Sequence, residues 1–148
     1  MSGDSRLADA IEQLMRAAVG ITTRSLTDVG AGTDLTLQQW RALVVIVGVG
    51  AAGLRVGELA ASLGLAMPGA SRLAARLERR GLATVTRDAA DRRVAVVRPT
   101  AAGVDLWQAV VQRRRGHIVA ALEAAGSAWD AASPDLVEAL AGAFSHEA

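Results

Sequence analysis

Between residues 55 and 100 the spacing of apolar residues changes several times, and this limits the folds that the segment can adopt. Residues 57–64 show the apolar spacing of a short helix, with Leu59, Ala60 and Leu63 on one face. A tight turn follows at Gly64-Leu65-Ala66, and Pro68, a favoured first-turn residue, begins a further helix that continues to Arg80. Gly81 then stands where a helix C-cap is expected.

Two short extended runs complete this stretch. Residues Ala83–Arg87 and 94–98 are rich in Val and Thr, and the polar loop 88–92 joins them, which predicts a β-hairpin. Pro99 has no N–H to donate, so we expect the second strand to lose its last ladder bond. A short helix, a tight turn, a longer helix and a hairpin in this order predict a winged helix-turn-helix.

The same stretch concentrates the positive charge of the chain. Residues 55–98 hold nine arginines and four acidic residues, a net charge of +5, although the whole chain carries only +1. All sixteen basic residues are arginine. Such a concentration is expected of a surface that meets phosphates.

The helix over residues 68–80 separates its apolar residues from its basic ones. Ala70, Leu73, Ala74 and Leu77 form a stripe that can dock on a core. Small residues and arginines on the opposite face suit an approach to the major groove, and arginines on the hairpin suit phosphates and the minor groove. The DNA-contacting residues predicted in this way are Pro68, Gly69, Ser71, Arg72, Ala75, Arg76, Arg79, Arg87, Arg92 and Arg93. The helix start has no Ser, Thr or Asp cap, a weakness of about 1 kcal/mol that a DNA phosphate would partly offset.

Helical spacing flanks this segment on both sides. An apolar stripe runs from Leu7 to Val29, and Thr36 and Gln39 have the spacing of a capping box that begins an almost wholly apolar, buried helix. A long helix follows Thr100 and ends near Gly126, and the run 113–115 of three arginines is expected to be a solvated face. Ser133-Pro134-Asp135 begins a last helix. Its predicted buried residues are Leu136, Val137, Leu140 and Phe144, and Trp107 and Trp129 are expected to be core or dimer-interface anchors.

Several motifs, taken in order, resemble the multiple-antibiotic-resistance regulator (MarR) family over nearly the whole chain. They are Thr36-Leu37-Gln38-Gln39-Trp40-Arg41-Ala42-Leu43, Leu59-Ala60-Ala61-Ser62-Leu63-Gly64-Leu65, Ser71-Arg72-Leu73, Leu77-Glu78-Arg79-Arg80-Gly81-Leu82, Asp91-Arg92-Arg93 and Thr100-Ala101-Ala102-Gly103. The resemblance implies a homodimeric bacterial transcription regulator, mostly a repressor, that binds a pseudo-palindromic DNA operator. Its terminal helices would build the dimer interface.

The resemblance also implies particular residue roles. The family's Asp-x-Arg wing pattern falls on Asp91 and Arg93, so Asp91 would brace the wing by pairing with an arginine and Arg93 would enter the minor groove. A pocket for a small aromatic effector would lie near Leu37, Trp40 and Leu43, although a tryptophan there is more often a core residue. The absence of cysteine excludes the family's peroxide-sensing branch.

The expected fold is mostly α with a small β-wing, divided into a dimerisation helix at 1–34, a winged domain at 35–100 and dimerisation helices at 101–148. We expect a cytoplasmic, non-enzymatic protein without membrane contact, because the chain has no signal-like start, nucleophile elbow or phosphate-binding glycine loop. The two histidines, His117 and His146, have no neighbouring ligands, so neither a metal nor a cofactor is expected. A ligand-independent regulator and a winged helix used only for protein contacts stay open as alternatives.

Overall fold

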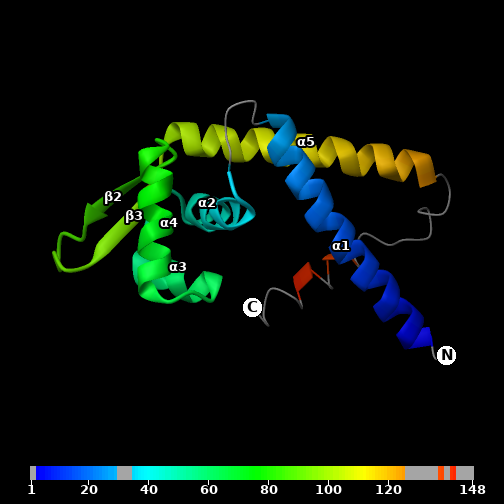
Figure 1. The fold of residues 1–148 in the computed structure, drawn as a ribbon, viewed down its shortest axis with the longest axis horizontal. Coiled ribbons are helices and arrows are strands. Elements are labelled where there is room, and N and C mark those ends of the chain that lie inside the picture. Colours follow the sequence, from blue (N-terminus) through cyan, green and yellow to red (C-terminus); the bar gives the residue numbers. More distant parts are fainter. Residues whose placement is uncertain (1–2, 30–34, 126–136, 139–140, 143–148) are drawn as a thin grey trace. The chain divides into compact units, whose positions relative to one another are not determined.

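The computed structural model describes residues 3–29, 35–125, 137–138 and 141–142, and its elements confirm a mostly α fold with a small β-wing (Figure 1). The chain divides into two compact units, residues 1–114 and residues 115–148. The elements, in chain order, are α1 (Gly3–Val29), α2 (Leu37–Val49), the 3-10 turn η1 (Gly50–Ala52), β1 (Leu54–Arg55), α3 (Val56–Leu63), α4 (Met67–Arg79), β2 (Ala83–Arg87), β3 (Ala95–Pro99) and α5 (Ala101–Ala125). The assignment of dimerisation to 1–34 and 101–148 stays a prediction.

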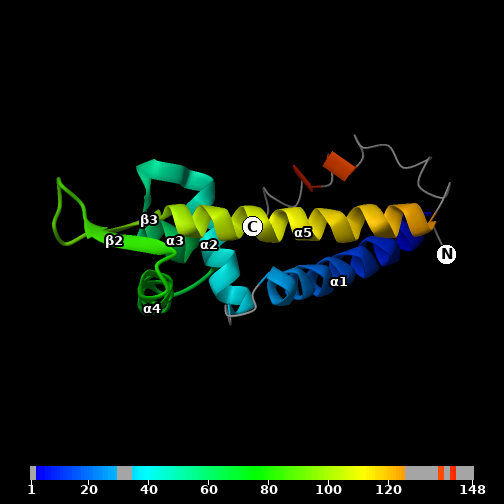
Figure 2. The same ribbon diagram turned by 90° about the horizontal axis from the view of Figure 1, so that it is seen from above.

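The core of the first unit lies where α2, α3 and α4 meet the sheet. Helix α4 packs against α2, α3 and β2, and Figure 1 shows these elements gathered beside the hairpin. The largest side chains that are fully buried there come from every one of these layers: Leu43, Ile46, Leu59, Leu77 and Val97, with Val110 from α5. Figure 2 shows the loop between β2 and β3 projecting away from the helices.

Helix α2 begins with the predicted capping box. The Thr36 side chain accepts from the backbone N–H of Gln39 at 3.2 Å, and the Gln39 side chain accepts from the backbone N–H of Thr36 at 3.0 Å. Two N–H groups that the helix itself leaves unpaired are satisfied in this way. The expectation that α2 is a buried helix is wrong for one face of the helix, because Leu37 and Val44 are 40% and 38% exposed.

Glycines end both helices of the helix-turn-helix. Gly64 has a φ of 64°, the left-handed conformation that glycine adopts without steric cost, and Leu65 N donates to Ala60 O at 2.9 Å. At the end of α4, Gly81 has a φ of 69° and Leu82 N donates to Leu77 O at 2.9 Å. These bonds satisfy helix-end carbonyls and turn the chain into the next element, as the sequence predicted.

The three strands form an antiparallel sheet in the order β1-β3-β2. Pro99 lies opposite Ala83 at the end of β3, and Thr100 N still donates to Leu82 O at 3.2 Å. Successive backbone groups of a strand point to opposite sides, so the nitrogen of Pro99 faces away from β2. The predicted loss of the last bond between these strands is therefore wrong.

The two long helices, α1 and α5, bury fewer of their residues than the winged segment, residues 35–100. In α1, Ser25 and Leu26 are buried near the C-terminal end, whereas Leu14 is 56% exposed. Helix α5 ends at Ala125, close to the predicted end. In the second unit Val137 is 54% exposed, contrary to its predicted burial. The predictions for Trp129, Leu136, Leu140 and Phe144 lie outside the residues that the structure describes.

Gly103 explains why α5 begins as close to the winged segment as it does. A methyl group at this position would overlap the carbonyl oxygen of Leu82. The Thr100 hydroxyl donates to Gly81 O at 2.6 Å and accepts from Gly103 N at 3.1 Å, which caps the helix. Among the described residues, no helix has the length and hydropathy needed to cross a membrane.

Candidate nucleic-acid interface

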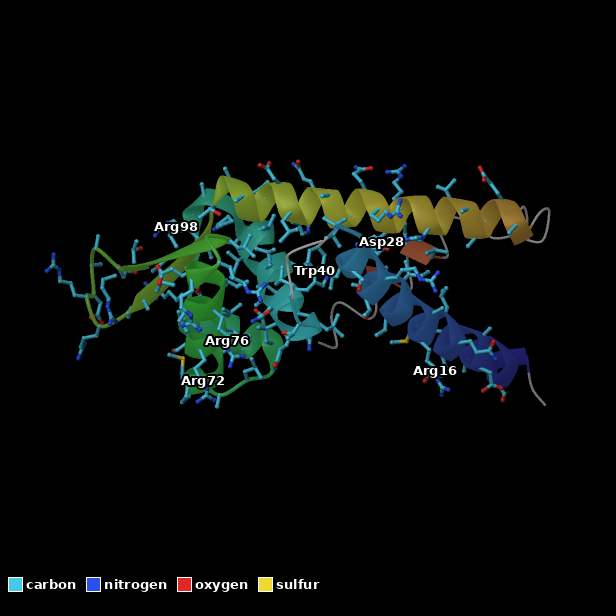
Figure 3. The ribbon with its side chains drawn as sticks, turned by 45° about the horizontal axis from the view of Figure 1, so that its top comes forward. Arg16, Asp28, Trp40, Arg72, Arg76 and Arg98 are labelled. Carbon is cyan, nitrogen blue, oxygen red and sulfur yellow. The ribbon has the colours of Figure 1, made fainter. Side chains whose placement is uncertain are left out.

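Helix α4 is strongly two-sided. Ala70, Leu73, Ala74 and Leu77 are buried, which confirms the predicted stripe. On the opposite side Ser71, Arg72, Arg76 and Arg79 are exposed, and Figure 3 shows the side chains of Arg72 and Arg76 extending from α4. Pro68 is also exposed, while Gly69 and Ala75 are half-buried. The helix therefore presents a narrow face of small residues flanked by guanidinium groups.

The start of α4 has no side-chain cap, as the sequence predicted. Ala66 occupies the N-cap position with extended backbone angles and makes no side-chain bond to the helix. Pro68 lies in the first turn, where its missing N–H costs nothing. The N–H groups of Gly69 and Ala70 both donate to Ala66 O, at 2.9 and 3.2 Å, so the first turn is closed by backbone bonds.

Asp88 organises the wing loop between β2 and β3. Its Oδ1 accepts from the backbone N–H groups of Ala90 at 2.8 Å and Asp91 at 3.4 Å. Asp88 N in turn donates to Val94 O at 2.9 Å, which closes the base of the loop. The N–H groups of Ala90 and Asp91, followed by the Arg55 guanidinium, lower the pKa of Asp88 below its usual 3.8. Its carboxylate is therefore ionised at neutral pH.

Asp91 and Arg93, the residues of the family's wing pattern, pair with each other. Asp91 Oδ1 accepts from Arg93 N at 3.0 Å and from Arg93 Nε at 3.2 Å, and Oδ2 accepts from Arg93 Nη2 at 3.3 Å. The Arg93 side chain, followed by its backbone N–H, lowers the pKa of Asp91. Arg93 is 92% exposed all the same, so its guanidinium stays within reach of a ligand.

A residue outside the predicted set connects the wing to the helices. Arg55 precedes α3, and its Nη2 lies 3.5 Å from Asp88 Oδ2. The backbone N–H of Arg55 also donates to Glu58 Oε2 at 2.7 Å, which starts the helix. Arg55 was visible in the sequence only as the first arginine of the basic stretch. No local spacing indicates that it meets Asp88, because the pair forms across the fold.

Arg55 of β1 and two arginines of the hairpin line one hollow. It has a volume of about 460 Å³ and opens between the start of α3, the start of α4 and the hairpin. Its lining includes Arg55, Met67, Ser71, Arg87 and Arg93. Arg87 Nη1 donates to Arg93 O at 3.3 Å, so the hairpin arginines are held beside one another. Three residues of the predicted set, Ser71 of α4 and Arg87 and Arg93 of the hairpin, thus meet at this hollow.

Arg92 and Arg98 differ in what their guanidinium groups contact. Arg92 is exposed in the wing loop, where the sequence placed it. Arg98 is half-buried: its Nε donates to Ala51 O at 3.2 Å and its Nη1 to Thr86 Oγ1 at 2.8 Å. It therefore ties the turn before β1 to the hairpin.

A second, smaller hollow lies beside Trp40 and has a volume of about 250 Å³. Of the three residues predicted for an effector pocket, only Trp40 lines it, together with Arg41, Val44, Val45, Ser62, Leu63 and Arg114. Leu43 is fully buried in the core and Leu37 lies outside the lining. Trp40 itself is only 3% exposed, so it is mainly a core residue, which was the favoured alternative.

Arg113 and Arg115 are exposed, as predicted for a solvated face, and the prediction is wrong for Arg114 alone among the three arginines of the run. Arg113 Nε lies 2.9 Å from Asp28 Oδ2 and so joins α5 to α1. Arg114 is half-buried in the lining of the smaller hollow, while Arg115 is exposed. The part of the chain that the structure describes holds no cluster of three or more His, Cys, Asp or Glu that could bind a metal.

These features define a winged helix-turn-helix with a basic recognition face, the class of domain that reads duplex DNA. Residues 33–94 match the model of the MarR family, the family that the sequence motifs resemble. None of the curated proteins compared with the chain matches it.

Three solved structures share this fold over nearly the whole chain. The transcriptional regulator Tm0710 from Thermotoga maritima is 25% identical, with a TM-score of 0.73, and covers 97% of this chain and 96% of its own. A mutant of MepR from S. aureus, solved bound to an oligodeoxyribonucleotide, is 20% identical, with a TM-score of 0.62 and coverages of 95% and 94%. CouR from Rhodococcus jostii RHA1, solved bound to p-coumaroyl-CoA, is 22% identical, with a TM-score of 0.64 and coverages of 93% and 87%.

Proposed function

We propose that this protein is a transcription regulator that binds a pseudo-palindromic DNA operator as a homodimer and represses the genes that the operator controls. One observation carries the proposal: Ser71, on the exposed side of α4, lines the same hollow as Arg87 and Arg93 of the wing, and Arg72 and Arg76 are exposed on the same helix. The match to the MarR-family model supports it, and so does the fold shared with MepR, which was solved with DNA. An enzymatic role has no comparable support among the described residues.

In this proposal α4 lies in the major groove. Arg72 and Arg76 are exposed on its outer side and are placed to bond the O6 and N7 atoms of guanine. Pro68, Gly69, Ser71 and Ala75 allow the helix backbone a close approach, and Arg79 and Arg87 meet phosphates. The wing reaches the adjacent minor groove, where a narrow groove attracts the guanidinium groups of Arg92 and Arg93.

A homodimer would present two such helices to one duplex. The exposed apolar residues Leu14, Met15 and Val19 of α1 and Ile118 of α5 are the surfaces we expect it to bury. The two recognition helices would then reach successive major grooves, about 34 Å apart. The operator is expected to repeat its half-site with this spacing.

An effector site beside Trp40 is the less direct part of the proposal. The small hollow combines an aromatic wall with Arg41 and Arg114, which suits an aromatic ligand that carries a negative charge. CouR was solved with p-coumaroyl-CoA, which shows that a protein of this fold binds an aromatic acyl ligand. If such a ligand releases the DNA, salicylate-like aromatics should lower operator affinity by the usual coupling of about 1–3 kcal/mol. No change across a panel would favour a ligand-independent regulator.

The test compares two arginines that the proposal assigns different roles. Arg72→Ala should weaken binding to the selected operator by about 1–3 kcal/mol and binding to scrambled DNA much less. Arg93→Ala should weaken both duplexes and reduce the slope of log Kobs against log salt by about one unit. Titrations at several salt concentrations measure both effects.

Arg115→Ala is the matched control, since it removes the same charge from an exposed position of α5. It should leave the operator affinity unchanged. Equal weakening of operator and scrambled DNA by Arg72→Ala would contradict base readout by this residue. Binding of a protein partner, with no salt-sensitive DNA binding at all, would support the protein-interaction alternative.

A further inference from the structure

Met67 is an apolar side chain that the fold leaves outside the core. It is the first residue of α4 and is 53% exposed, although the neighbouring residues Ala70 and Leu73 of the same helix are buried. Its sulfur lies beside Gly57 of α3, where an added methyl group would meet it at 3.7 Å. The DNA-contacting residues predicted from the sequence did not include it.

The surroundings of Met67 combine charged side chains with the apolar side chains of Val56, Val94 and Ala95. It lines the same hollow as Arg55, Arg87 and Arg93, with Ser71 one turn further along α4. A phosphate is a suitable partner for the arginines but gives a thioether side chain no favourable contact. In the major groove the apolar group that a protein meets is the C5-methyl of thymine, and the N-terminal residues of a recognition helix reach the base edges.

We propose that Met67 selects a thymine in each half-site by contacting its C5-methyl group. This inference rests on the proposed function, because it needs α4 in the major groove. Arg72 and Arg76 lie five and nine residues further along the helix, about one and a half and two and a half turns, and would read guanine at other positions. Met67 would then supply the preference for thymine at the position beneath the start of α4.

The first experiment finds the position. Operators are selected from a library of random duplexes with the natural protein, with Met67→Ala and with Val49→Ala. Val49, an apolar residue on α2 that is 43% exposed, is the matched control. We expect one thymine per half-site in the sequences that the natural protein and Val49→Ala select. Met67→Ala should lose the preference at that position alone and keep the others.

The second experiment removes the methyl group from the DNA instead. Deoxyuridine keeps every hydrogen-bonding atom of thymine and lacks only the C5-methyl. Replacing the selected thymine should raise the Kd of the natural protein about fourfold per half-site, and about fifteenfold when both half-sites change, as expected for a buried methyl group. Met67→Leu should respond in the same way, whereas Met67→Ala should bind both duplexes equally.

The outcomes separate this inference from the function on which it rests. An operator that is selected normally, without a position that depends on Met67, would refute the role of Met67 and leave the regulator function intact. The same holds if deoxyuridine weakens the natural protein and Met67→Ala equally. Failure of the natural protein to select any duplex sequence would refute both.

Discussion

The winged segment and helix α1 bury their apolar residues very differently. In the winged segment Leu59, Leu77 and Val97 have no exposed surface, because two helices and a sheet close over them. In α1 the apolar residues Leu14 and Val19 are 56% and 53% exposed. Both regions have regular apolar spacing, so periodicity alone does not distinguish a residue buried within the chain from one left for another chain.

The winged segment forms a core within one chain, and the proposed dimer would cover the exposed apolar residues of α1. Monomeric proteins seldom expose a contiguous apolar surface along a helix without using it. Among the described residues, the C-terminal end of α1 is anchored in the chain itself, through the buried Ser25 and Leu26 and the pair of Asp28 with Arg113. The exposed residues Leu14, Met15 and Val19 form the part of α1 that we propose a second copy covers.

The strongest test of this difference places a charge on α1. Leu14→Asp should convert the proposed dimer into monomers, because an unpaired charge buried in an interface costs about 3–5 kcal/mol. Operator affinity should then fall by about 100-fold or more, since a monomer cannot engage two half-sites together. Light scattering and operator titrations measure the two effects.

Gln13→Asp adds the same charge at an exposed position on the other side of α1 and should leave the dimer intact. A Leu14→Asp variant that still dimerises and binds the operator normally would show that this face is not the interface. Two copies of the protein would then have to meet through a surface other than this face of α1.

A core truncation tests the other half of the comparison. Leu77→Ala should lower the free energy of unfolding by about 2–5 kcal/mol, because it leaves a cavity among fully buried neighbours. Denaturant unfolding at one protein concentration measures it. Val49→Ala, at an exposed site on α2, should cost less than about 1 kcal/mol. Similar losses in the two variants would mean that the winged core is less tightly packed than its burial indicates.

Gly103 tests the junction of α5 with the winged segment. Gly103→Ala should destabilise the protein by about 1–3 kcal/mol, because the added methyl group overlaps Leu82 O and the backbones must separate. Gly116→Ala, in the same helix with open space around it, should stabilise the protein by up to about 1 kcal/mol. Thermal unfolding of both variants gives the sign. A stabilising Gly103→Ala would show that α5 does not start against Leu82.

The smallest effect concerns the carboxylates of the wing loop. The folded protein lowers the pKa values of Asp88 and Asp91 below the usual 3.8, so their contribution to stability is present above that pH and lost as pH falls through the lowered values. The wing should therefore be insensitive to pH from about 5 to 8. NMR titration of the carboxyl carbons should give midpoints below 3.8 for both residues.

Asp88→Asn provides the control for that titration. It removes the charge of residue 88 and its ion pair with Arg55, while Asp91 keeps the Arg93 side chain and backbone N–H that lower its pKa. The midpoint of Asp91 should therefore stay low. Midpoints at or above 3.8 in the natural protein would mean that the loop bonds do not persist in solution.

Local pattern was enough to predict the elements and the orientation of α4. The buried stripe of Ala70, Leu73, Ala74 and Leu77 follows from helical periodicity. The Thr36–Gln39 capping box and the glycine turn at Gly64 follow from the preferences of residues at helix ends. Each of these depends on residues within a few positions of one another, and such interactions can be read directly from the order of the amino acids.

The contacts that complete the surface were decided by the tertiary structure. Arg55 meets Asp88 across the fold, and Arg113 meets Asp28 although 85 residues separate them. Strands β2 and β3 stay paired at Pro99 because the nitrogen of Pro99 faces away from β2, and this direction depends on the register of the two strands. Met67 lies outside the core because α4 packs against the core through a neighbouring face of the helix. No local propensity encodes these outcomes, since each depends on which distant backbone arrives beside the residue and at what angle.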